Sequence, residues 1–274
     1  MQPVSAKKLA KVSVGNVNRH TDIFQGLAIA PRYVDVWLPP TYEQNPEVRY
    51  RVLYMHDGQN LFDPELAYGG QTWGIAETLM RLSDLAPTMV VGIWNSPERW
   101  RDYYPQCGFE ALPDQQQALE RLGGVPYSSQ YADAIVGRLK PFIDTQYRTL
   151  AKREDTLMMG SSMGGLISLY TLVKHPDIFA GAGCLSTHWS AGNEYMVDAL
   201  AAALPKPNSH RLYFDYGTET LDAEYEPFQK RMNQHLERLG WTSFVSHKFI
   251  GAAHNEAAWR ERLEIPLRYL LGAT

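Results

Sequence analysis

The sequence predicts an α/β fold with a mostly parallel, twisted central sheet and helices on both faces. Short apolar runs alternate with longer helical patterns along the chain. The runs 51–55 and 89–94 are apolar at most positions, as is typical of strands that a parallel sheet buries on both faces. Residues 156–173 show a strand, a tight turn and a helix in direct succession. Because no internal repeat occurs, we expect one domain over 1–274.

The other elements follow from the local pattern. The valines at 12, 14 and 17 suggest an edge strand, and 32–38 alternates as a strand before Pro39 and Pro40 stop it. Residues 95–105 form an aromatic loop after a strand, a place where open α/β sheets bind ligands. Residues 106–130 are read as a surface insertion or cap. Further strands are expected at 180–186, 211–217 and 243–250, and helices at 73–82, 131–147 (kinked by Pro141), 224–239 and the C-terminus.

Composition and charge exclude several function classes. The 274 residues are 45% hydrophobic and 20% charged, which is typical of globular proteins. With a formal net charge of −4 and no basic block, we expect no nucleic-acid partner. No apolar run has the length of a membrane span or of a signal peptide, so we expect a cytoplasmic protein without a membrane partner. Export of a processed form stays open as an alternative. Cys107 and Cys184 predict neither a disulfide framework nor a metal site, and a bridge between them stays open.

The turn at 160–164, GSSMG, fits the nucleophile-elbow pattern G-x-S-x-G. Glycines flank such a serine because a Cβ would clash with the strand and the helix at so sharp a turn. Ser162 holds the central position, with Ser161 as its rival. The Met163 N–H would then lie at the start of a helix, where it can bind an oxyanion. The alternative is an ordinary strand-to-helix turn without a catalytic role.

The loop that follows the strand at 51–55 is the second candidate element. It reads HDGQNLFD over 56–63, and Gly58 permits an unusual backbone there. In α/β-hydrolases a loop at this place supplies the second oxyanion N–H, which here would come from Gln59 or from Gly58 itself. His56, Asp57 and Asn60 can also pin the loop by local hydrogen bonds.

A serine, an acid after a later strand and a histidine after the last strand follow one another along the chain, which is the α/β-hydrolase order. His254 would take the proton from the serine, and the acid would fix the imidazole tautomer. The stretches VWLPP (36–40), LYMHDGQN (53–60), VGI (91–93), LKPFID (139–144), GSSMGG (160–165) and GAAH (251–254) together resemble the "putative esterase" family of α/β-hydrolases.

The resemblance places the family serine on Ser162 and the family histidine on His254. Relatives carry an Asp or Glu in the loop after a glycine like Gly217, some of them three residues later, where this chain has Thr220. We favour Asp222 as the acid, with Glu219 as the runner-up and Asp215, inside the strand, as a weaker candidate.

The resemblance implies a serine carboxylesterase without metal or cofactor. Its partner would be a small-molecule or carbohydrate ester, such as an acetyl or feruloyl sugar ester. Gly58, Arg99, His188 and Trp189 are candidate substrate-binding residues, although His188 can equally be a buried, satisfied histidine. The alternatives are a siderophore esterase, which would need cations such as Arg99 and Arg101, an acyltransferase, a peptidase, and a non-catalytic binding module on the same scaffold. The oligomeric state is not readable from the sequence.

Overall fold

A twisted eight-stranded sheet organises the chain, with strand order β1-β2-β4-β3-β5-β6-β7-β8. The computed structural model describes residues 8–272. Strands β1 and β2 and strands β2 and β4 pair antiparallel, and all other neighbours pair parallel. The predicted, mostly parallel α/β sheet is therefore confirmed. The strands are β1 (Asn16–His20), β2 (Val34–Leu38), β3 (Arg51–His56), β4 (Thr88–Ile93), β5 (Thr156–Ser161), β6 (Gly181–Leu185), β7 (Arg211–Tyr216) and β8 (Phe244–Lys248).

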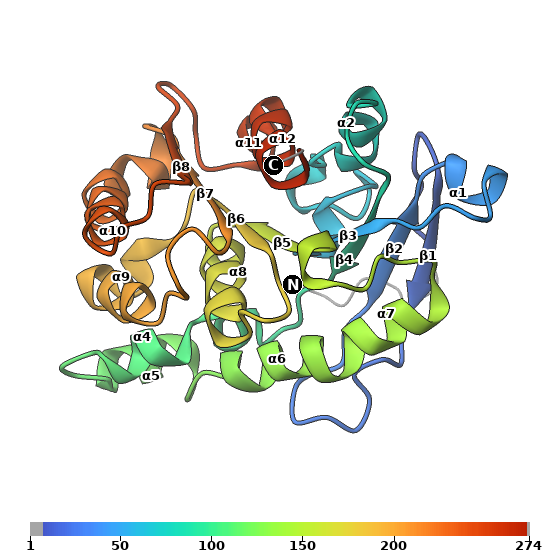
Figure 1. The fold of residues 1–274 in the computed structure, drawn as a ribbon. Helices are drawn as coiled ribbons and strands as arrows, with labels where there is room; N and C mark the ends of the chain where they lie inside the picture. Colours follow the sequence, from blue (N-terminus) through green and yellow to red (C-terminus); the bar gives the residue numbers. More distant parts are fainter. Residues whose placement is uncertain (1–7, 273–274) are drawn as a thin grey trace.

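Helices cover both faces of this sheet, as Figure 1 shows. One face carries α2 (Ile75–Arg81), α11 (Glu256–Arg262) and α12 (Glu264–Leu271). The other face carries α6 (Ser128–Ala134), α7 (Lys140–Gln146), α8 (Met163–Lys174), α9 (Asn193–Ala202) and α10 (Glu226–Arg238). Short helices occupy the connections: α1 (Thr41–Gln44), α3 (Arg99–Tyr103), α4 (Gln106–Glu110) and α5 (Gln116–Leu122).

Alternation along the strands divides the core into two layers. In β5, Leu157 and Met159 pack toward α11 and α12, whereas Met158 between them packs in the layer that contains α8. All three side chains are buried. The central strands thus have no polar face, which explains why their sequence reads as continuous apolar runs.

The structure corrects two local predictions. The segment 95–105 is not an extended loop, because α3 begins at Arg99 and ends at Tyr103. The helix predicted over 131–147, with a kink at Pro141, is interrupted by a π-helical turn, Ile135–Leu139, which ends two residues before Pro141. Proline has no N–H to donate to the preceding turn, so the helix widens there. Residues 106–130 contain α4, α5 and the start of α6, and α4 packs against α9.

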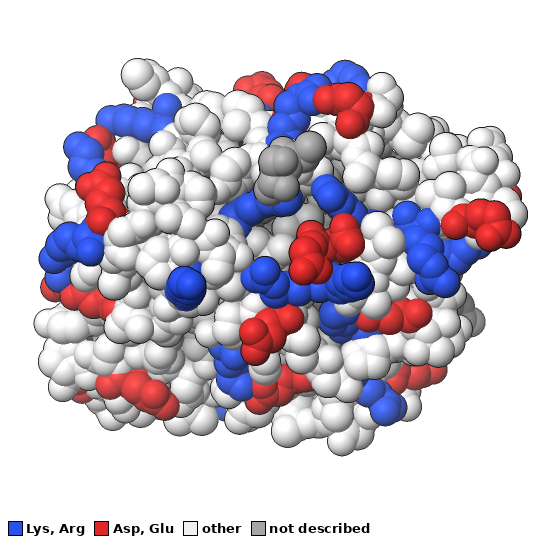
Figure 2. Space-filling model, viewed as in Figure 1, with Lys and Arg blue, Asp and Glu red and all other residues white. Residues whose placement is uncertain are grey.

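The remaining sequence expectations concern cysteines, membranes and surface charge. Cys107 and Cys184 are both free thiols, so the bridge left open by the sequence does not form. No helix in residues 8–272 is long and apolar enough to cross a membrane. On the face shown in Figure 2, basic and acidic side chains are interspersed over an otherwise uncharged surface.

Candidate active site

The serine at the centre of the predicted elbow lies between the end of β5 and the start of α8. Ser162 has φ 57° and ψ −124°, a conformation that L-residues rarely adopt. Such strain persists only where the surroundings impose it, and it is concentrated at functional sites. A Cβ on Gly160 would lie 2.6 Å from the Gly164 carbonyl oxygen, so only glycine fits at this first position of the motif. The local geometry is that of a nucleophile elbow.

Two backbone amides near this turn are those predicted to bind an oxyanion. Among residues 8–272, neither Met163 N nor Gln59 N donates one of the hydrogen bonds found outside regular helices and strands. Met163 is the first residue of α8, so its N–H lies at the positive end of the helix dipole. Gln59 belongs to a short 3-10 turn, Gly58–Asn60, directly after β3. The elbow and this loop adjoin, since a Cβ on Gly164 would lie 3.5 Å from Asp57 Oδ2.

The predicted base and the favoured acid are in direct contact. His254 Nδ1 lies 2.6 Å from Asp222 Oδ1, and Asp222 is fully buried. Burial alone would raise the pKa of Asp222, but hydrogen bonds from His254, Ser186 and Gly217 outweigh it and hold the pKa below its ordinary value. An ionised carboxylate only accepts, so Nδ1 of His254 carries the proton and Nε2 is left as a base.

The two rival acids are placed differently. Glu219 is exposed. Asp215 is fully buried in β7 and forms an ion pair with Arg262, with 2.9 Å between Oδ1 and Nη2. Only Asp222 among the three accepts a hydrogen bond from the His254 ring.

The serine and the histidine are not joined by a hydrogen bond. His254 bonds to Thr220 through its backbone N–H and to Asp222 through its ring, and none of the hydrogen bonds among the described residues links it to Ser162 Oγ. Catalytic hydrogen bonds are often long in ligand-free enzymes and tighten when substrate binds. The structure therefore brings acid and base together and leaves the serine hydroxyl unattached.

His188 lies beside both the serine and the histidine. Its backbone N–H donates to the Ser162 carbonyl at 3.2 Å, and its ring Nδ1 lies 2.5 Å from the Tyr225 hydroxyl. Burial, followed by the electrostatic influence of His254 and Arg99, lowers the pKa of His188 to about 4. The ring is therefore neutral at pH 7. Trp100, from α3, is 44% exposed and meets the His188 ring edge-on at 6.0 Å.

Two other residues suggested for substrate binding are engaged elsewhere. Trp189 is fully buried, and its indole N–H donates to Gln229 Oε1 at 3.0 Å, so it belongs to the core rather than to a pocket wall. Arg99 makes two hydrogen bonds of 2.7 Å to the Asp57 carboxylate. Gly58 has a structural role, because a Cβ there would lie 2.5 Å from the Gly92 backbone.

Sequence reasoning did not find the polar groups behind Asp222. Ser186, Trp259 and Arg262 converge there from the end of β6 and from α11. They belong to no local motif, so no sequence signal identifies them. The structure itself marks one of them as unusual, because Ser186 has a positive φ of 42°.

Comparison with known proteins identifies the family and the fold. The sequence model of the family described as "Putative esterase" matches residues 30–270. An uncharacterized protein of Bacillus subtilis (strain 168), YbbA, is 24% identical over 251 residues, which are 88% of this chain and 93% of YbbA. Among solved structures, a ferulic acid esterase superposes with a TM-score of 0.68 at 19% identity, covering 94% of this chain and 98% of its own. The enterobactin hydrolase IroE superposes with a TM-score of 0.62 at 19% identity, covering 96% of this chain and 98% of its own. The fold is thus that of the α/β-hydrolase esterases, and the chain belongs to the Putative esterase family.

Proposed function

We propose that this protein is a serine carboxylesterase with Ser162 as nucleophile, His254 as general base and Asp222 as the acid. The observation that carries the proposal is the 2.6 Å contact between His254 Nδ1 and the buried Asp222 carboxylate. This contact presents Nε2 of the imidazole as the proton acceptor in a protein whose elbow serine is held in a strained turn.

The reaction follows from these positions. His254 takes the proton from Ser162 Oγ as the oxygen attacks the ester carbonyl, and then gives that proton to the leaving alcohol. The N–H groups of Met163 and Gln59 donate to the tetrahedral oxyanion, and one such donor contributes about 2.7–4 kcal/mol in a measured protease. Water, deprotonated by His254, attacks the acyl carbonyl, and His254 returns that proton to Ser162 Oγ as the acid leaves. An acyltransferase would use the same groups with an alcohol in place of water.

The two cations suggested for an anionic ligand, Arg99 and Arg101, are both engaged within the chain, which supports a neutral ester as the substrate. Arg99 is neutralised by Asp57. Arg101 bonds to Glu98 and to the Val125 carbonyl, and its guanidinium lies 3.7 Å from the centroid of the Tyr127 ring. Both cations that a siderophore esterase would use for an anionic ligand are therefore already paired. Acetyl and feruloyl sugar esters are the substrates we infer, with the exposed Trp100 as a surface for an aromatic or sugar ring.

The test is a time course with p-nitrophenyl acetate, run beside Ser162→Ala and with intact-mass detection of the acyl-enzyme. We expect turnover and an acetyl adduct in the wild type and neither in the variant. Full activity of Ser162→Ala would refute the assignment. A phenolic alcohol added as acceptor separates hydrolysis from acyl transfer, because transfer would yield a new ester.

A further inference from the structure

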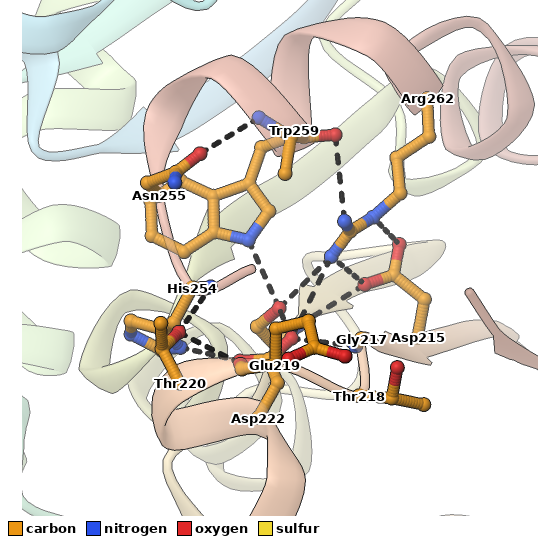
Figure 3. A network of polar contacts seen from close by, with 12 residues as sticks. Asp215, Gly217, Thr218, Glu219, Thr220, Asp222, His254, Asn255, Trp259 and Arg262 are labelled. Carbon is orange, nitrogen blue, oxygen red and sulfur yellow. Dashed lines mark hydrogen bonds and ion pairs between the residues drawn. The ribbon is translucent and has the colours of Figure 1, made fainter. Parts of the chain in front are cut away.

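A second set of polar groups, which includes Trp259 and Arg262 (Figure 3), is linked to the carboxylate oxygen of Asp222 that His254 does not use. Ser186 Oγ lies 2.5 Å from Asp222 Oδ2. The same oxygen lies 2.9 Å from the Trp259 indole nitrogen and 2.9 Å from Arg262 Nη2. Ser186 and Asp222 are both fully buried. One serine hydroxyl therefore links the acid of the proposed triad to two side chains of α11.

The chemistry of the donors determines the direction of this chain. An indole N–H and a guanidinium can only donate, so both occupy acceptor positions on Ser186 Oγ. The single hydroxyl proton of Ser186 is then left for Asp222 Oδ2. The guanidinium polarises the hydroxyl and makes it a stronger donor to the carboxylate.

The two carboxylate oxygens of Asp222 consequently have separate tasks. Oδ2 accepts from Ser186 Oγ at 2.5 Å and from the Gly217 N–H at 2.6 Å, while Oδ1 accepts from His254 at 2.6 Å. Donors on Oδ2 hold the carboxylate plane, so that Oδ1 keeps its aim at the imidazole. A Cβ on Gly217 would lie 3.0 Å from Asp222 Oδ2 and 2.0 Å from the Ala252 carbonyl oxygen, so this close approach requires glycine.

The side chains that support Asp222 are themselves held in place by an ion pair. Arg262 is held by Asp215 at 2.9 Å and lies 4.0 Å from Asp222 Oδ2. The Ser186 N–H donates to Asp215 as well, at 2.9 Å to its carbonyl and 3.1 Å to Oδ1. This anchoring explains how Ser186 keeps a φ of 42° without being glycine.

We propose that Ser186, with Arg262 and Trp259 behind it, is a positioning residue that holds Asp222 in the orientation in which it orders and polarises His254. The inference rests on the proposed function, because it assigns a role relative to that triad. Removing the Ser186 hydroxyl should weaken the chemical step, leave substrate binding nearly unchanged and alter the Asp222–His254 hydrogen bond directly.

The His254 ring also faces other groups, whose influence the experiment must hold constant. Tyr225 and Trp259 meet the ring edge-on at 5.7 and 5.1 Å. His188 and Glu256 are the remaining titratable neighbours that sense its charge. A serine-to-alanine change at 186 touches none of these side chains except Trp259, which loses its hydrogen-bond acceptor.

The experiment compares Ser186→Ala with the wild type and with Ser128→Ala. Alanine keeps the Cβ, and hence the backbone preference, of residue 186. Ser128 is a fully buried serine of α6 whose Oγ has no hydrogen-bond partner among the described residues, so it controls for loss of a buried hydroxyl. We expect kcat on p-nitrophenyl acetate to fall by roughly 10- to 100-fold in Ser186→Ala, as for a lost hydrogen bond to a charged group, with KM within about twofold. Ser128→Ala should keep the wild-type kcat.

A second measurement reads the hydrogen bond without relying on activity. The proton on His254 Nδ1 is followed by NMR at low field, assigned by its disappearance in His254→Gln. It should shift in Ser186→Ala and stay in place in Ser128→Ala. An unmoved resonance in folded Ser186→Ala would overturn the proposal, whether or not kcat falls.

The two measurements separate this proposal from the proposed function. A shifted resonance in a protein without esterase activity supports the positioning role and refutes the esterase. Esterase activity with an unmoved resonance supports the esterase and refutes the positioning role of Ser186. If Ser186→Ala does not fold, Ser186→Gly takes its place, since glycine also removes the hydroxyl and adopts a φ of 42° without strain. The same changes in kcat and in the resonance are then expected.

Discussion

Replacing Asp222 with asparagine keeps the shape of the side chain and removes its charge. Every hydrogen-bond partner of this carboxylate donates to it: Ser186 and Gly217 to Oδ2, and His254 to Oδ1. An asparagine offers one accepting oxygen and one donating nitrogen. Because two donors meet at the Oδ2 position, the amide oxygen should take that position and turn the NH₂ group toward His254.

This arrangement would reverse the tautomer of the imidazole. Nδ1 of His254 would have to accept, so the proton would sit on Nε2, the atom that must receive the Ser162 proton. In a measured serine protease the wrong tautomer lowers kcat about 10⁴-fold, which corresponds to about 5.4 kcal/mol at 1.36 kcal/mol per tenfold. We expect Asp222→Asn to lower kcat by about 10³- to 10⁴-fold.

The assay is steady-state hydrolysis of p-nitrophenyl acetate, with circular dichroism and thermal unfolding to verify that the variant is folded. Glu219→Gln is the matched control, because Glu219 lies three residues earlier in the same loop and is exposed. Its kcat should remain within about twofold, as for a surface change away from the chemistry. A folded Asp222→Asn with more than a tenth of the wild-type kcat, or an equal loss in Glu219→Gln, would refute the assignment of the acid.

Two further changes test the oxyanion loop and a buried histidine. Gly58→Ala should lower kcat by about 100-fold or more, because the added Cβ would lie 2.5 Å from the Gly92 backbone and displace the adjoining Gln59 N–H. Gly137→Ala is the control, because no atom lies within 4 Å of the added Cβ, and it should keep full activity in the same assay. Burial lowers the pKa of His56 to about 3, so the folded state cannot take up the proton that the unfolded chain binds below pH 6.5. His56 should therefore lower the free energy of unfolding by about 1.6 kcal/mol between pH 6.5 and pH 5. Urea unfolding at both pH values measures the cost, and an equally steep loss in His56→Gln would contradict it.

Local sequence patterns were sufficient to predict the central strands and the turn at Ser162. Continuous apolar runs identified β3, β4 and β5, because strands buried on both faces admit no polar side chain. The glycines of the elbow identified the turn at Ser162, since each requirement acts within five residues. A break in the helix over 131–147 was likewise predicted from Pro141, because a missing N–H is a property of one residue, although the π-helical turn lies before it, at Ile135–Leu139. The prediction of a loop over 95–105 was wrong, because α3 is too short for its helical periodicity to be recognised in the sequence.

Relations between distant segments required the tertiary structure. The sequence favoured Asp222 but left Glu219 as a rival, because both acids lie in one loop, whereas the folded loop buries Asp222 and exposes Glu219. Trp189 follows a strand end, where a pocket residue was expected, yet it packs into the core. Ser186 meets Arg262 across 76 positions of the chain. The sequence by itself determined the elements and the serine turn, whose causes are local, and only the packing of α11 against the ends of β6 and β7 decided which polar groups support Asp222.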